Sequence, residues 1–174
     1  MTPSSDENSP PPPRGEEAPS KLEALRQKAK GTTINDHTLL ATDYLNHFNE
    51  IIMLIEMIPD MHECLEDARA WHPKTYQQHF RDSSFSDKEL AIEAYEHAPE
   101  EYRGSFDYAV ERMNLLVQKG LDELEKTITG GDSSAIAETA RKISRALQKL
   151  VDVTSAIIHG GEDILDQEEI DRLL

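Results

Sequence analysis

Two side chains at metal-ligand spacing, His47 and Glu50, are the first candidates for chemistry in this sequence. A histidine and a glutamate three residues apart on a helix project from one side, as they do in di-iron helical bundles. Such a centre also needs carboxylates from other helices, and Glu56 is the only further acid at a plausible offset. No histidine and cysteine spacing matches zinc. We therefore expect hydrogen-bonded or surface histidines, and no metal or other cofactor.

The sequence offers no support for nucleophilic catalysis. It contains no G-x-S-x-G elbow, no P-loop and no dinucleotide-binding glycine fingerprint. Its single cysteine, Cys64, lies close to Glu63 and Glu66, and acidic neighbours raise rather than lower the pKa of a thiol. We expect Cys64 to be a packing residue. A lone cysteine forms no intramolecular disulfide, which favours a reducing cytoplasm as the compartment.

The last eleven residues combine a helix cap with a row of apolar side chains. Asp166 is placed to cap a helix, and Glu169 three residues later completes a capping box. Leu165 and Ile170 have the spacing of a hydrophobic staple. A helix this short is marginal alone in water, so it needs a groove on another surface. Its apolar side is formed by Ile170, Leu173 and Leu174.

The same run, ILDQEEIDRLL over residues 164–174, resembles the N-terminal peptide of the flagellar motor switch protein FliM, I-L-S-Q-x-E-I-D-x-L-L. It is also similar to the C-terminal peptide of the chemotaxis phosphatase CheZ. In both families this peptide docks as a helix on the response regulator CheY. The resemblance implies that this chain binds a CheY-type receiver domain. The implied partner-binding residues are Leu165, Asp166, Gln167, Glu169, Ile170, Asp171, Leu173 and Leu174.

The resemblance also raises dephosphorylation of the regulator as a second function. In CheZ-like proteins a D-x-x-x-Q run on a bundle helix supplies the glutamine that orients water. The only such run here is Asp163 to Gln167, inside the tail, because Gln118 and Gln148 are preceded by Asn and Ser at that spacing. We also expect no E-x-x-N pair, the pattern of the CheC and CheX phosphatases, on the apolar helices. The sequence therefore favours a non-enzymatic protein over an enzyme.

Charge and hydropathy disfavour several classes of partner. The 174 residues include 34 Asp and Glu against 18 Lys and Arg, which gives a net charge of −16. Nucleic-acid binding needs a basic face that neutralises phosphates, and an anionic membrane surface has the same requirement. No apolar run approaches the roughly 20 residues that cross a bilayer. Residues 1–20 also lack the hydrophobic segment of a secretory signal.

Apolar periodicity predicts the helices that position these residues. Residues 38–58 are rich in apolar side chains at three- and four-residue steps, and Pro59 ends the pattern. Residues 105–129 and 133–158 carry two further stripes joined by a glycine-containing turn, which predicts an antiparallel αα-hairpin. Capping and proline signals over residues 60–97 predict short helices whose aromatic side chains belong to the core.

The expected fold is all-α, an irregular helical bundle with an αα-hairpin over residues 105–158. We expect a disordered proline-rich arm at 1–33, a helical domain at 34–158, and a linker with a flexible docking helix at 159–174. The functional hypothesis is a cytoplasmic, bacterial chemotaxis or flagellar-signalling protein that acts as adaptor, competitor or localiser. The alternatives are a CheZ-like phosphatase and a structural helical scaffold with its tail packed in cis. The apolar stripes also permit a homodimer.

Overall fold

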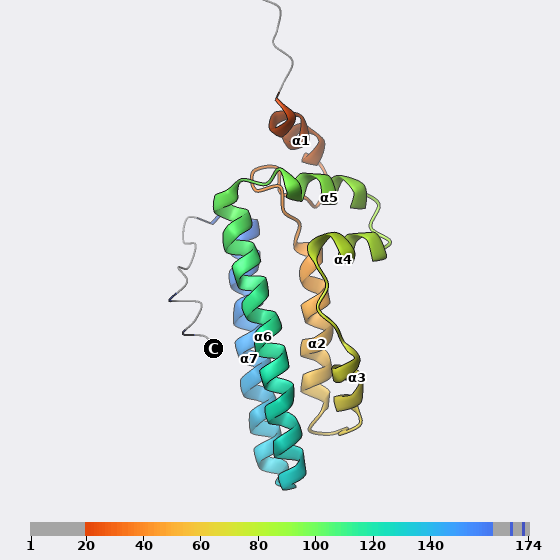
Figure 1. Ribbon diagram of the computed structural model, residues 1–174, viewed down its shortest axis with the longest axis vertical. Coiled ribbons are helices and arrows are strands. Elements are labelled where there is room, and N and C mark those ends of the chain that lie inside the picture. Colours follow the sequence, from red (N-terminus) through yellow and green to blue (C-terminus); the bar gives the residue numbers. More distant parts are fainter. Residues whose placement is uncertain (1–19, 162–167, 169–171, 173–174) are drawn as a thin grey trace, which may run out of the picture.

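The computed structural model describes residues 20–161 together with Glu168 and Arg172. Over these residues the chain forms seven α-helices and no strand, which confirms the predicted all-α fold. Figure 1 shows α6 and α7 side by side as a long hairpin, with α2 along it and α4 and α5 across one end. The elements are α1 (Lys21–Ala29), the 3-10 helix η1 (Thr42–Leu45), α2 (Asn46–Met57), α3 (Cys64–Ala70), α4 (Tyr76–Asp82), α5 (Lys88–Glu96), α6 (Glu100–Gly130) and α7 (Ser133–Ile158).

The hairpin of α6 and α7 is the largest element and follows the predicted stripes. Its turn contains Gly131 in the left-handed region (φ 75°), and the Asp132 carboxylate caps α7 by accepting from the backbone N–H groups of Ser134 and Ala135. Helix α6 begins at Glu100 rather than at 105, because its first turn is polar and carries no apolar signal. The buried stripe residues are Phe106, Met113, Val117, Leu121 and Leu124 in α6, and Ile136, Ala140, Ile143, Leu147, Leu150 and Ile157 in α7.

Gly120 of α6 lies directly against the Ile143 side chain of α7. A Cβ built on this residue would lie 2.8 Å from Cγ2 of Ile143, well inside van der Waals contact. Cγ2 is attached directly to the Ile143 β-carbon, so it moves only if the side chain or the helix moves. The absence of a side chain at Gly120 therefore sets the spacing of the two helices.

We expect Gly120→Ala to lower the free energy of unfolding by about 1–3 kcal/mol, the usual cost of overpacking a core. The matched control is Gly130→Ala on the same helix, where nothing lies within 4 Å of the added Cβ. Because alanine is the better helix former, this control is expected to leave stability unchanged or raise it by up to about 1 kcal/mol. Urea denaturation followed by circular dichroism measures both. Equal effects of the two substitutions would contradict the close approach.

A tight loop precedes η1, so the predicted helix start at residue 38 is wrong. The Asn35 side-chain oxygen accepts from the backbone N–H groups of His37 and Thr38, both at 2.9 Å. Such local bonds compete with helix formation and favour turns. Leu39 adopts a left-handed conformation (φ 61°) and is fully buried. The Thr38 hydroxyl donates to the carbonyl oxygen of Ile158 at 2.5 Å, which joins the loop to the end of α7.

The predicted boundary of the N-terminal arm at residue 33 is also wrong, because residues 21–29 form α1. The Ser20 hydroxyl caps this helix by accepting from the Glu23 N–H. Leu25 and Ala29 are buried in the core, and Lys21 forms an ion pair with Glu93 of α5. Two apolar side chains at i and i+4 are thus enough to dock the helix on the body. Residues 1–19 lie outside the described residues.

Candidate functional site

The predicted partner-binding residues belong to the C-terminal segment, most of which lies outside the described residues. That is the case for Leu165, Asp166, Gln167, Glu169, Ile170, Asp171, Leu173 and Leu174. Within the segment the structure describes Glu168 and Arg172, and both are exposed. The Arg172 N–H donates to the Glu168 carbonyl oxygen at 3.1 Å, and their side chains form an ion pair at 3.7 Å. The backbone bond has the i to i+4 spacing of an α-helix.

The C-terminal segment leaves the body at a fixed point. Gly160 adopts a left-handed conformation (φ 71°), and its N–H donates to the Ile157 carbonyl at 3.0 Å. The Gly161 N–H donates to the Ala156 carbonyl at 3.0 Å, so the two bonds form a Schellman motif. A Cβ at Gly160 would lie 3.2 Å from the His37 ring. Residues 159–161, predicted as linker, are therefore the cap of α7.

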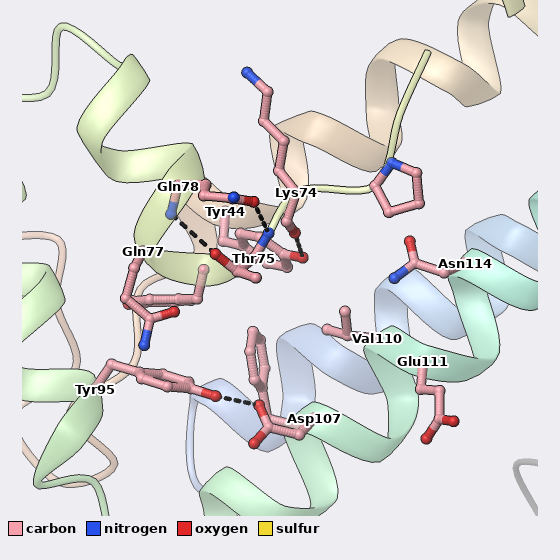
Figure 2. Close-up of a pocket in the computed structure, with 13 residues that line it drawn as sticks. Tyr44, Lys74, Thr75, Gln77, Gln78, Tyr95, Asp107, Val110, Glu111 and Asn114 are labelled. Carbon is pink, nitrogen blue, oxygen red and sulfur yellow. Dashed lines mark hydrogen bonds between the residues drawn. The ribbon is translucent and has the colours of Figure 1, made fainter. Parts of the chain in front are cut away.

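A cavity of about 340 Å³ lies between the start of α4 and the first half of α6. The Tyr95 hydroxyl donates to Asp107 Oδ1 at 2.6 Å, and the Tyr44 hydroxyl donates to the Lys74 carbonyl at 2.7 Å (Figure 2). The Tyr76 hydroxyl oxygen accepts from the Ala41 N–H at 2.9 Å. The wall is thus a set of aromatic rings whose hydroxyl groups already have partners.

Burial dominates the electrostatics of this cavity. It raises the pKa of Asp107 above its usual range, and the hydrogen bond from Tyr95 and the Arg103 charge offset only part of that rise. Burial also raises the pKa values of Tyr44, Tyr76 and Tyr95, so all three hydroxyl groups stay protonated at neutral pH. The three hydroxyl groups therefore serve as hydrogen-bonding groups here, Tyr44 and Tyr95 as donors and Tyr76 as an acceptor, and not as nucleophiles.

The expectation that no E-x-x-N pair lies on the apolar helices is wrong. Glu111 and Asn114 stand in that order on α6, and both line the cavity. In Figure 2 the Asn114 amide projects from α6 toward the Lys74 segment, whereas the Glu111 carboxylate points away from it. The side-chain oxygen of Asn114 is buried and has no hydrogen-bond partner among the described residues. Residue spacing alone identifies the pair, although neither residue belongs to the buried apolar stripe of α6.

His47, the candidate metal ligand, has a structural role. Its Nε2 lies 2.8 Å from the His72 carbonyl oxygen, and its ring stacks on Trp71 with a centroid distance of 4.5 Å. The Trp71 Nε1–H donates to the His47 carbonyl at 3.0 Å. Glu56, the further acid considered with it, accepts from the Ser144 hydroxyl. Among the described residues, no three His, Cys, Asp or Glu side chains are arranged to hold a metal ion.

The environment of His47 predicts a loss of stability in mild acid. Burial lowers its pKa below the ordinary value near 6.5, so the unfolded chain binds this proton more tightly than the folded chain. The stability from neutral His47 is present above about pH 6.5 and falls as the pH drops below that value. We expect the free energy of unfolding of the wild type to fall more between pH 7 and 5 than that of His47→Gln.

Denaturation of both proteins across this pH range measures the difference. His79, whose pKa burial also lowers, is present in both proteins. Glutamine is the matched replacement because it retains a donor for the His72 carbonyl and does not titrate in this range. Parallel pH profiles for the two proteins would rule out the assigned protonation of His47.

No protein-family model matches the chain, and comparisons with curated proteins and with solved structures found no match either. In the part of the chain that the structure describes, no helix has the length and apolar character required to traverse a bilayer. The residues that bear on function are therefore those of the C-terminal run and of the hairpin surfaces.

Proposed function

We propose that this protein binds a CheY-type response regulator through residues 164–174, as an adaptor, competitor or localiser in cytoplasmic chemotaxis or flagellar signalling. The observation that carries the proposal is the run ILDQEEIDRLL, which has the cap, the acidic positions and the apolar triplet of the FliM peptide together. Two described features support it. The fixed cap at Gly160 and Gly161 starts the segment at the surface, and Glu168 and Arg172 make a helical backbone bond while both remain exposed.

The energetics favour a weak and reversible complex. Burying an aliphatic side chain contributes about 1.5–3 kcal/mol, and the segment offers three, Ile170, Leu173 and Leu174. Ordering the helix opposes binding by about 2–5 kcal/mol, and lost rigid-body freedom opposes it further. The acids Glu168, Glu169 and Asp171 would steer the segment to a basic patch on the regulator. We expect micromolar or weaker affinity that falls as salt is added.

Titration of the full chain against a fluorescently labelled CheY-type receiver domain, with and without a phosphoryl-group mimic, tests the proposal. The control is the same chain ending at Gly161. Binding that depends on the last thirteen residues is the expected result. Equal binding by both chains, or none by either, would remove the assignment and leave a helical scaffold as the interpretation.

A phosphatase is the second candidate function, and the Glu111 and Asn114 pair is the observation that favours it. An amide could orient a water molecule for attack on the phosphorus of an aspartyl phosphate, while the neighbouring acid contacts a lysine of the regulator. The phosphorus to carboxylate-oxygen bond would break, releasing inorganic phosphate and the free carboxylate. The side-chain oxygen of Asn114 has no hydrogen-bond partner among the described residues, and because it is buried the cavity must open before this oxygen can hold such a water.

If the chain is a phosphatase, Asn114→Ala is expected to lower the rate of regulator dephosphorylation about 100-fold, the usual cost of removing one positioned polar group. A phosphate-release assay measures it. The matched control is Gln118→Ala, an exposed amide one turn further along α6, which is expected to leave the rate unchanged. A wild-type rate equal to the spontaneous rate would eliminate this candidate.

A homodimer through α2 is the third element of the proposal. Met53, Met57 and Met61 follow one another at four-residue steps, and they are 62%, 39% and 39% exposed. Met53 and Met57 lie on the exposed side of α2, and Met61 follows in the turn after the helix. Exposed methionines grouped in this way are typical of an interaction surface. Light scattering of the wild type and of Met53→Lys tests this element.

A further inference from the structure

A basic groove runs between the outer faces of α6 and α7, with a cavity volume of about 620 Å³. Five exposed bases line it, and none of them makes an ion pair with any residue that the structure describes. They are Lys119, Arg141, Lys142, Arg145 and Lys149. In a chain with a net charge of −16 this concentration of positive charge is unusual, and it needs an acidic occupant.

The walls and floor of the groove add an apolar component. Leu115 and Leu116 of α6 are partly buried, and Ala146 and Ile143 come from α7. Gly120 also lines the groove, directly against Ile143. An occupant that fits must therefore present both acids and aliphatic side chains. This is the composition of a short amphipathic helix with an acidic polar face.

The C-terminal segment of the same chain has this composition. Residues 162–174 contain six acids, one base and five aliphatic side chains. The base is Arg172, and it lines the groove together with Glu123 and Glu138, the acids among the described lining residues. The charges are thus complementary, since the segment is rich in acids, the groove is rich in bases, and the one base of the segment, Arg172, lines the groove together with two acids.

The tether is long enough for this arrangement. Lys149 and Lys142 lie 12 and 19 residues before Gly161 along α7, which corresponds to roughly 18 and 29 Å at the helical rise. Arg172 lies 11 residues after Gly161, and an extended chain of that length spans at most about 36–40 Å. The segment can therefore turn back at the Gly160 and Gly161 cap and reach the groove from the same molecule.

We infer that residues 162–174 dock in cis on the basic groove between α6 and α7. Docking places Ile170, Leu173 and Leu174 against this chain's own helices and withholds them from other proteins. A regulator then binds only the fraction of molecules whose segment is released, which lowers its apparent affinity by that fraction. This regulatory consequence rests on the proposed regulator binding, whereas the docking itself does not.

Amide exchange of residues 168–174, measured by NMR in the full chain, tests the docking. The variant is Lys142→Glu with Arg145→Glu, and the matched control is Lys28→Glu with Arg81→Glu, two exposed bases on α1 and α4 outside the groove. We expect slowed exchange in the wild type and the control, and faster exchange in the groove variant. Added salt is expected to speed exchange in the wild type, because it screens the attraction. Circular dichroism confirms that each variant is folded.

Two results would overturn the inference. Exchange rates that are alike in the wild type and the groove variant would show that the groove does not hold the segment. Protection that grows with protein concentration would show that the segment of a second copy occupies the groove instead.

A receiver-domain titration separates this inference from the proposed function. We expect the groove variant to bind the regulator about 3- to 10-fold more tightly than the control, corresponding to a free fraction of roughly 10–30%. Equal affinity of the two variants would contradict withholding by the groove. If neither variant binds while the exchange difference persists, the proposed function fails and cis docking stands.

Discussion

Replacing Leu173 with Asp is expected to weaken binding of the receiver domain by at least about tenfold. The substitution removes an aliphatic contact of about 1.5–3 kcal/mol and adds a carboxylate that must be desolvated. Since 1.4 kcal/mol corresponds to a factor of ten in affinity, a micromolar complex becomes difficult to detect. Ile170→Asp is expected to act in the same direction, because Ile170 lies one turn earlier on the same apolar side. Isothermal titration or fluorescence anisotropy measures both.

The control for this prediction comes from a position that the FliM-like pattern leaves open. Glu168 corresponds to the variable position of the motif and is exposed, so Glu168→Gln is expected to change affinity only slightly, through long-range steering. Binding that survives both Ile170→Asp and Leu173→Asp would remove the basis for the signalling assignment. Loss of binding with Glu168→Gln alone would instead indicate recognition dominated by charge.

Phe106→Ala is expected to have the largest effect on stability, a loss of about 3–5 kcal/mol. The Phe106 ring is 1% exposed and contacts Tyr44, Tyr76 and Tyr95, with centroid distances of 5.6, 5.7 and 6.4 Å. Removing it leaves a cavity where η1, α4, α5 and α6 meet. At roughly 2–4 °C per kcal/mol for a chain of this size, the Tm is expected to fall by about 6–20 °C in a calorimetric scan.

Phe106→Leu is the matched control, because it preserves an apolar side chain and is expected to lose less than half as much stability. If both variants unfold like the wild type, Phe106 is not a packing centre of the bundle. Below the unfolding transition, Phe106→Ala should leave regulator binding unchanged, since Phe106 is buried in the body and is not among the predicted partner-binding residues.

The hairpin could be predicted from sequence because its signals are local. Each apolar stripe repeats at helical spacing, and the turn is marked by Gly131 and Asp132 within four residues. The predicted start of a helix was wrong where a side chain forms hydrogen bonds with nearby backbone groups, as Asn35 does in the loop before η1. Capping signals over residues 60–97 also gave wrong starts for two of the short helices. Helices α3 and α5 instead begin at Cys64 and Lys88, without a side-chain cap hydrogen bond.

The candidate sites also differ in how far the sequence predicts them, depending on whether their residues are contiguous. The C-terminal run is contiguous, so its cap, acids and apolar residues can be recognised together, although its binding function stays a prediction. The cavity beside Asp107 could not be anticipated, because its lining comes from η1, α4, α5 and α6. The basic groove also depends on tertiary structure, since Lys119 and Arg145 meet only when the hairpin closes. The overall composition argued against a basic surface, because the net negative charge of the chain conceals a local excess of bases.

The C-terminal segment is joined to the body at the Schellman motif that ends α7, so the inferred docking is that of a ligand on a short tether. A short tether holds a peptide near its own surface at an effective concentration in the millimolar range. If the segment docks in cis as inferred, a free receiver domain at micromolar concentration would have to compete with that local concentration, and would bind only if its intrinsic affinity were much higher. The position of Gly160 and Gly161 would therefore set the affinity that a regulator needs in order to displace the docked segment. A regulator in its weakly binding state would leave the segment docked, and one in its tightly binding state would bind it.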